Sequence, residues 1–236
     1  MMLGDFAGIY CGPPPEPGTL WQDWNLDPFV LFVLIVLGLA VGRRPAGAAA
    51  VGLLFVVFVS PLCALTAALF SARVVHHVLL VVIAAPLLAI AWPGRRATAP
   101  ALPFGLATLI LWAWHLPAAY DAALGNMLLY WVMQITLLAS AVVMWRAILH
   151  RDQTPGPAIF FIFAGFVQMA LLGALLTLAP TQLYAIHALA PMAWGLTPLA
   201  DQQLGGLIMW MPAGLPYMAL IWVVARRSWR AMEKLS

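Results

Sequence analysis

The sequence contains very few charged residues. Only 8% of its 236 residues are Asp, Glu, Lys or Arg, whereas soluble domains carry about 25%. Hydrophobic residues make up 64% of the chain and occur in long runs separated by short polar links. This composition excludes an ordinary soluble domain and predicts an all-α, polytopic helical bundle in a lipid bilayer.

Cysteine is also scarce, and the common catalytic motifs are missing. The two cysteines, Cys11 and Cys63, are too few for a disulfide framework. They either form one bridge or leave Cys63 as a thiolate suited to copper. The chain has no H-E-x-x-H, C-x-x-C or P-loop pattern, and no nucleophile is paired with a base. We therefore expect a protein that is not an enzyme, with a redox subunit as the alternative.

The apolar runs divide the chain into three regions. Residues 1–27 form an acidic tail outside the membrane, residues 28–227 a membrane domain, and residues 228–236 a basic tail. The tail has no basic start and is interrupted by prolines, so we expect no cleaved signal peptide. A long loop, 180–203, precedes the last span. Seven spans are predicted, at about 28–42, 46–64, 71–92, 101–116, 125–148, 157–179 and 204–225.

The basic residues predict the orientation of these spans. They form short clusters between apolar runs rather than one patch, so the net charge of +3 does not indicate a nucleic-acid partner. If the spans alternate, ten of the eleven Lys and Arg residues fall on one side and Arg73 on the other. The positive-inside rule then places the N-terminus outside and the C-terminus in the cytoplasm. The ten are Arg43, Arg44, Arg95, Arg96, Arg146, Arg151, Arg226, Arg227, Arg230 and Lys234.

Histidines near the outer ends of the spans form the candidate site. His76 and His77 lie about one turn inside the third span, and His115 ends the fourth. Ionisable residues inside a span cost about 2.5–3.5 kcal/mol each, so they face a polar partner or a wet cavity. The residues expected to line this site are Asp201, Gln202, Gln203, Tyr120, Asp121, Arg73 and His187.

Imidazole with thioether or thiolate ligands suits copper, and imidazole alone also suits haem iron. We expect copper, with haem between His77 and His115 as the alternative. Each histidine also has a structural interpretation, as a hydrogen-bonding group between helices or at a helix end. The expected metal ligands are His77, His115, His76, Met209 and Cys63.

Residues 200–212 combine three polar side chains with a glycine pair at the start of the last apolar run. Asp201 is expected to cap that helix, and Arg73 to form a buried pair with Asp121 or Asp201. Gly205 and Gly206 carry no side chain, so a neighbouring helix or a ligand can approach the backbone there.

At these residues the chain resembles the CtaG-type family of assembly factors for caa-type cytochrome c oxidase. The most specific likeness is Asp201-Gln202-Gln203-Leu204-Gly205-Gly206-Leu207-Ile208-Met209-Trp210. Further likenesses are Trp114-His115-Leu116-Pro117 with Tyr120-Asp121, Ser60-Pro61-Leu62, and Phe70-Ser71-Ala72 followed by His77.

The resemblance implies a multi-pass protein of the bacterial cytoplasmic membrane. Its partners would be cytochrome c oxidase subunits, and it would deliver or insert copper into the oxidase. The sequence departs from the family's pattern at Cys63, Arg73, His76, Tyr130 and Gln134. A structural or accessory oxidase subunit, or a haem-binding redox subunit, is therefore retained as an alternative.

Overall fold

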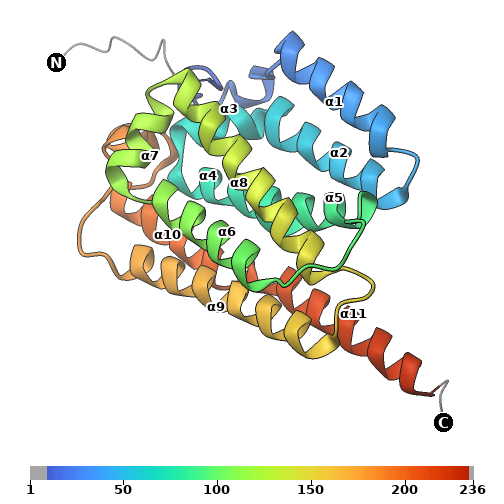
Figure 1. Cartoon of the computed structure of the whole chain (residues 1–236). Coiled ribbons are helices and arrows are strands. Elements are labelled where there is room, and N and C mark those ends of the chain that lie inside the picture. Colours follow the sequence, from blue (N-terminus) through green and yellow to red (C-terminus); the bar gives the residue numbers. More distant parts are fainter. Residues whose placement is uncertain (1–9, 234–236) are drawn as a thin grey trace.

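The computed structural model describes residues 10–233, and the secondary structure of that range is helical, without a strand (Figure 1). Four short helices, η2 (Leu20–Gln22), η3 (Leu79–Ala84), η4 (Ala185–His187) and η5 (Ala190–Trp194), join the α-helices. The α-helices are α1 (Pro28–Val41), α2 (Pro45–Val59), α3 (Pro61–Ala68), α4 (Phe70–Val78), α5 (Ala85–Ala91), α6 (Ala101–Trp114), α7 (Pro117–Leu124), α8 (Met127–Ile148), α9 (Pro155–Leu178), α10 (Pro198–Trp210) and α11 (Gly214–Glu233).

The predicted all-helical class is confirmed, and several of the helices are candidate membrane spans. Four helical segments are long and apolar enough to cross a bilayer: Phe70–Ala91, Met127–Ile148, Pro155–Leu178 and Pro198–Arg230. Two bent pairs, α2 with α3 and α6 with α7, raise the number to six if each pair is one span. Helix α1 has 14 residues, about 21 Å at 1.5 Å per residue, which is short of a 30 Å hydrocarbon core.

Local sequence signals set most helix ends. Proline opens α1, α2, α3, α7, α9 and α10, where its missing N–H costs nothing and its fixed φ suits a helix. Side chains then satisfy the free N–H groups: Asp27 accepts from Phe29 at 2.8 Å, and Asn126 accepts from Leu129 at 3.1 Å. Ser60 separates α2 from α3, which opens at Pro61, and the helix axis turns by 48° there.

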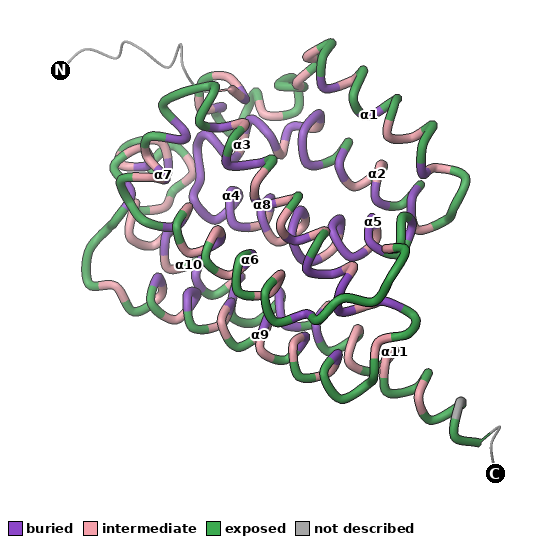
Figure 2. The backbone as a smooth tube through the Cα atoms, viewed as in Figure 1, coloured by how far each residue is buried: buried purple, intermediate pink, exposed green. Residues whose placement is uncertain are grey.

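The segment α4–η3–α5 lies at the centre of the bundle and is its most buried span (Figure 2). The π-turn η3 ends two residues before Pro86. Such a wider turn relieves the clash between a proline ring and the carbonyl one turn earlier. Arg73, His76, His77 and Leu80 all lie on this span and are buried, as their helical spacing predicts.

The helices do not all pack against their neighbours in the sequence. Short links favour contact between consecutive spans, so the spans containing His77 and His115 are predicted to touch along their length. Instead α8 packs against both α5 and α6, and α6 also packs on α9. Helix α10 lies against α4 and α9, while α1 lies against α2. The two histidine-bearing spans therefore do not pack against each other along their whole length.

The last span begins earlier than predicted. Helix α10 starts at Pro198, so Asp201, Gln202 and Gln203 lie inside it rather than in a loop. The break in this span falls at residues 211–213, between α10 and α11. The connection before α10 is also partly ordered into η4 and η5. The start of this helix is difficult to predict from the sequence, because polar side chains in the first turn are equally typical of a loop.

Most of the arginines gather at one end of the bundle. Arg44 donates to Ala91 O and Arg146 to Pro93 O, while Arg151 and Arg227 line one cavity. Arg73 lies toward the opposite end, together with Asp121 and Asp201. The sorting of charges by end predicted from the sequence is therefore present in the structure.

Candidate functional site

Asp201 binds the start of a neighbouring helix. Its carboxylate accepts hydrogen bonds from Phe70 N at 2.6 Å and Ser71 N at 3.1 Å, and also from the Ser71 hydroxyl. It therefore caps α4, while α10 is capped by Thr197, which accepts from Ala200 N at 3.1 Å. The prediction that Asp201 caps its own helix is wrong. A carboxylate suits the α4 terminus because the first N–H groups there have no helical acceptor.

The rest of the polar motif and the glycine pair hold helices together. Gln202 accepts from Leu183 N at 2.7 Å and donates to Leu176 O at 3.3 Å. Gln203 contributes its backbone carbonyl to Thr177. A Cβ on Gly205 would lie 2.7 Å from the Phe70 ring, and one on Gly206 would lie 2.5 Å from Gly173 O. The close approach predicted at the two glycines is therefore made by neighbouring helices.

Tyr120, Asp121 and His187 fix the connection over this end of the bundle. Asp121 accepts from Ala185 N at 3.0 Å and Ile186 N at 3.3 Å. The Tyr120 hydroxyl and His187 Nε2 are 2.9 Å apart, and His187 Nδ1 lies 3.4 Å from Ala68 O. A carbonyl only accepts, so Nδ1 carries the proton and Nε2 accepts from Tyr120. Burial, then the positive charge of Arg73, lower the pKa of His187 to about 3.

His77 and His115 do lie together. Their ring centres are 6.0 Å apart, about the spacing of two imidazoles that share one ion through bonds of about 2 Å. The Nδ1 atom of His115 lies 2.7 Å from Leu111 O, so it carries the proton and leaves the Nε2 lone pair free. Neither ring nitrogen of His77 has a hydrogen-bond partner among the described residues.

Two methionines complete this pair of histidines. A cavity of about 10 Å³, room for about one water molecule, is lined by His77, His115, Met169 and Met209. The other residues around it are apolar: Val74, Val78 and Leu111. Two imidazoles and two thioethers without a carboxylate form a soft, uncharged ligand set, which suits Cu(I). Met169, on α9, has no local sequence signal that sets it apart from a packing residue.

Arg73 and His76 do not join that cavity. Arg73 is fully buried and its guanidinium carbon lies 5.2 Å from the centre of the Tyr130 ring. It makes no ion pair with Asp121 or Asp201, and its three nitrogens have no hydrogen-bond partner among residues 10–233. The predicted pair is therefore wrong, because both carboxylates are held by backbone N–H groups. His76 packs edge-on against Phe58 and His77.

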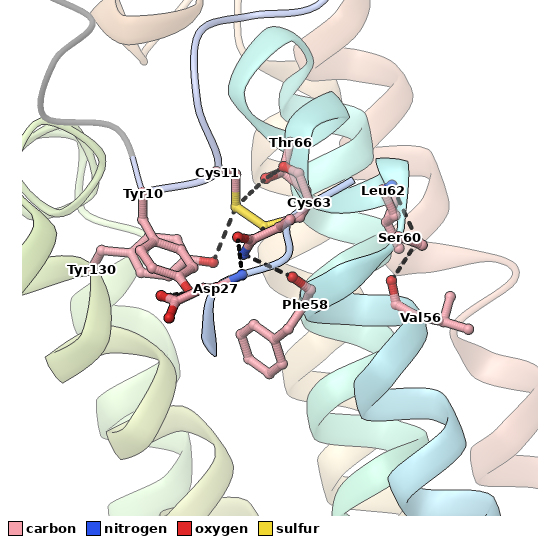
Figure 3. The surroundings of a disulfide bond; sticks show 11 residues. Tyr10, Cys11, Asp27, Val56, Phe58, Ser60, Leu62, Cys63, Thr66 and Tyr130 are labelled. Carbon is pink, nitrogen blue, oxygen red and sulfur yellow. Dashed lines mark hydrogen bonds between the residues drawn. A yellow bond between two sulfur atoms is a disulfide. The ribbon is translucent and has the colours of Figure 1, made fainter. Parts of the chain in front are cut away.

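Cys63 is bonded to Cys11 (Figure 3). Of the two alternatives for this cysteine, the structure therefore has the bridge, and a sulfur in a disulfide is not a thiolate ligand. Tyr10 stacks on Tyr130 and donates to Asp27 at 2.6 Å, which holds the pKa of that carboxyl below its ordinary value. The acidic tail is thus attached to the bundle from residue 10 onward.

The described residues contain no group of three or more His, Cys, Asp and Glu side chains that could hold a metal ion. A metal site at this end accordingly depends on thioether ligands beside His77 and His115.

Comparison with known proteins gives one match. A family model described as cytochrome c oxidase caa3 assembly factor (Caa3_CtaG) matches residues 93–231, more than half of the chain. The matched range includes His115, Met169 and Met209, whereas His77 lies before it. No curated protein matches the sequence, and no solved structure matches it.

Proposed function

From the match over residues 93–231, by which the chain belongs to the cytochrome c oxidase caa3 assembly factor family, we propose that it carries copper for a haem-copper oxidase. Copper is the cargo, and the carrier site is the cavity lined by His77, His115, Met169 and Met209. Its partners are subunits of the oxidase. No catalytic step is assigned to the chain.

The single observation that carries this proposal is the composition of that cavity. Thioether sulfur and neutral imidazole are soft ligands that favour Cu(I) over hard divalent cations. The hydrogen bond from His115 Nδ1 to Leu111 O orients the second nitrogen for binding, as outer hydrogen bonds do in known metal sites. Thioethers bind copper without adding charge, so the site can release its ion to a stronger acceptor.

The membrane arrangement is part of the same proposal. Seven spans result if α1 and both bent pairs each cross the bilayer, with the N-terminus outside and the C-terminus in the cytoplasm. The arginine-rich end then faces the cytoplasm. The copper cavity lies toward the outer face of a bacterial cytoplasmic membrane, the side on which a disulfide persists.

Cu(I) binding to the purified full-length protein tests the proposal, with a chelator of known affinity as competitor. We expect about one ion per chain, and at least a tenfold loss of affinity in H77A, in H115A and in the double variant. The three losses should be similar, because half a site holds no ion. H150A is the matched control, since His150 lies at the opposite end and bonds Gly94 O.

The methionines are tested with leucine, which keeps the volume and removes the sulfur. M169L and M209L should weaken Cu(I) binding, while M133L, a buried methionine outside the cavity, should not. In cells, oxidase copper content should fall in the same variants. The copper proposal would be contradicted if the wild-type protein binds no copper, or if the losses of Cu(I) affinity in H77A and H115A add up in the double variant. The alternative, a structural subunit of the oxidase, would then remain.

A further inference from the structure

A second cavity, the arginine cavity, lies at the end of the bundle opposite the histidine pair. It has a volume of about 560 Å³, within the range of small-molecule sites. It lies between α8 and the link from α5 to α6, which passes the end of α8 (Figure 1). Three of its six described lining residues are arginines, and none of the six is acidic: Gly94, Arg95, Arg96, Thr98, Val143 and Arg146.

Hydrogen bonds from the end of α8 fix the link that carries two of these arginines. Arg146 donates to Pro93 O at 3.2 Å, and its guanidinium carbon lies 5.2 Å from the centre of the Trp92 ring. His150, just after α8, has its Nε2 atom 3.2 Å from Gly94 O. Because a carbonyl only accepts, this nitrogen donates. The backbone directly before the other two arginines is therefore held at two consecutive residues.

Arg95 and Arg96 have no such structural role. Both are exposed, and neither side chain makes a hydrogen bond or an ion pair with another residue in the range 10–233. Arg44, by contrast, donates to Ala91 O at the end of α5. Guanidinium groups that line one cavity repel one another, and an anion between them removes that repulsion. The arginine cavity therefore has positive charge that the fold itself does not use.

We propose that the arginine cavity binds the headgroup of an anionic phospholipid, and most tightly a lipid with two phosphodiester groups. The planar guanidinium group donates two parallel hydrogen bonds to a phosphate, and the Thr98 hydroxyl can donate a further one. Three positive charges exceed what one phosphodiester neutralises, so a lipid with two is the better match. Basic pockets between membrane helices bind such headgroups in other proteins. The site is separate from the copper cavity and does not depend on the proposed copper function.

The surroundings of the cavity favour a lipid over a soluble phosphate compound. Val143 lines the cavity and is 52% exposed. It precedes Arg146 by three residues on α8, which places it about 4.5 Å nearer the middle of that candidate span. Trp92, next to Arg146, is 63% exposed, and tryptophan at the end of a span is typical of the membrane interface. A phospholipid contacts the arginines with its phosphates and these apolar side chains with its acyl chains, whereas a soluble phosphate contacts the arginines alone.

Lipid binding to the purified full-length protein in a neutral detergent, measured by native mass spectrometry, tests this proposal. The probes are cardiolipin, which has two phosphodiesters, and phosphatidylcholine with the same acyl chains. We expect cardiolipin to bind at least about tenfold more tightly than phosphatidylcholine. R95Q/R96Q should lose most of this preference. Its unfolding temperature without lipid should be that of the wild type, because both side chains are exposed and without structural partners among the described residues.

R226Q/R227Q is the matched control. It removes two adjacent arginines from α11, at the same end of the bundle, and neither of them lines the arginine cavity. This variant should keep the preference for cardiolipin. Equal losses in the two double variants would overturn the proposal, because they would indicate attraction to the total charge of this end rather than a site. Equal binding of the two lipids to the wild-type protein would also overturn it.

Inorganic phosphate distinguishes a lipid site from a site for a soluble anion. An excess of phosphate, at an ionic strength matched with sodium chloride, should displace little cardiolipin, because it does not replace the contacts of the acyl chains. Complete displacement by phosphate would overturn the lipid proposal and assign the cavity to a soluble phosphate compound.

Discussion

The polar residues at the end of the bundle that holds the disulfide and the histidine pair divide into two groups. Those of the first group hold the fold together, and those of the second have ring nitrogens left to bind a ligand. The side chains of the first group, Asp201, Gln202, Asp121 and His187, bind backbone groups. Asp201 and His187 also bind the hydroxyls of Ser71 and Tyr120, respectively. Neither ring nitrogen of His77 has a hydrogen-bond partner among residues 10–233, and the bond from His115 Nδ1 to Leu111 O leaves the Nε2 lone pair of that ring to bind a ligand. Ligand capacity at this end therefore belongs to the two histidines and the neighbouring thioethers.

Asp201 illustrates the first group, and its substitution by Asn is informative. Asn keeps one oxygen but loses the charge and one acceptor, so one N–H at the start of α4 is left unpaired. We expect D201N to lower the free energy of unfolding in detergent by about 1–2 kcal/mol, with normal copper binding per folded molecule. T197A should cost about 1 kcal/mol through loss of the α10 cap. Normal stability with lost copper binding would instead make Asp201 part of the metal site.

His187 predicts a dependence of stability on pH. Its pKa is lowered to about 3 in the folded protein from 6.5 in a model peptide, so below pH 6.5 the unfolded chain binds a proton that the folded chain excludes. Its contribution is complete above pH 6.5 and is lost as the pH falls toward 3, by up to about 1.4 kcal/mol per pH unit. Between pH 7 and pH 5, the unfolding temperature should fall more in the wild type than in H187Q. Parallel curves would contradict this assignment.

At the scale of whole helices, α10 is the element around which the end that holds the histidine pair is assembled. Asp201 on this helix caps α4, Gly205 and Gly206 touch α4 and α9, and Met209 lines the cavity beside the histidine pair. Glycines, which carry no side chain, therefore set how closely α10 approaches α4 and α9, as in other membrane helix pairs.

The glycine contact predicts a strong position effect. A Cβ on Gly206 would lie 2.5 Å from Gly173 O and 2.7 Å from Thr177 N, and backbone atoms cannot move aside locally. G206A should therefore lower the free energy of unfolding by about 1–3 kcal/mol or more and reduce the yield of folded protein. G52A is the control, because a Cβ there meets nothing within 4 Å and alanine improves helix propensity. Equal effects of the two changes would show that α9 and α10 do not pack this closely.

For the whole molecule, the two ends differ in chemistry. One end holds the disulfide, the buried carboxylates and the histidine pair, while the other holds most arginines. A disulfide requires an oxidising compartment, and arginines favour the cytoplasmic side. Both observations favour the orientation proposed above, with the end that holds the disulfide outside.

A reporter that is active only in the cytoplasm tests this orientation. Fused after Arg227 it should be active, and inserted before Trp21 it should be inactive. Alkylation without reductant should modify neither cysteine, because Cys11 and Cys63 are bridged. The opposite reporter activity at either site would reject the arrangement with an outer N-terminus and seven spans.

The sequence by itself determined the class, most helix ends and the depth of the site. Apolar runs, prolines and caps act locally, so they can be read from the sequence. Because a helix rises 1.5 Å per residue, the position of a residue in its span also gives its depth in the bundle. The sequence therefore predicted that His77, His115 and Met209 lie at the same depth. The partner of each side chain was decided by the tertiary structure. The neighbours of a side chain at a given depth depend on which helices pack together. Helix packing placed Met169 in the cavity, brought Asp201 to the start of α4 and left Arg73 without a carboxylate partner among the described residues. Short links suggested that α5 and α6 are neighbours, but packing inserted α8 between them, because burying the central span on all sides removes more polar surface from lipid than pairing it with one helix.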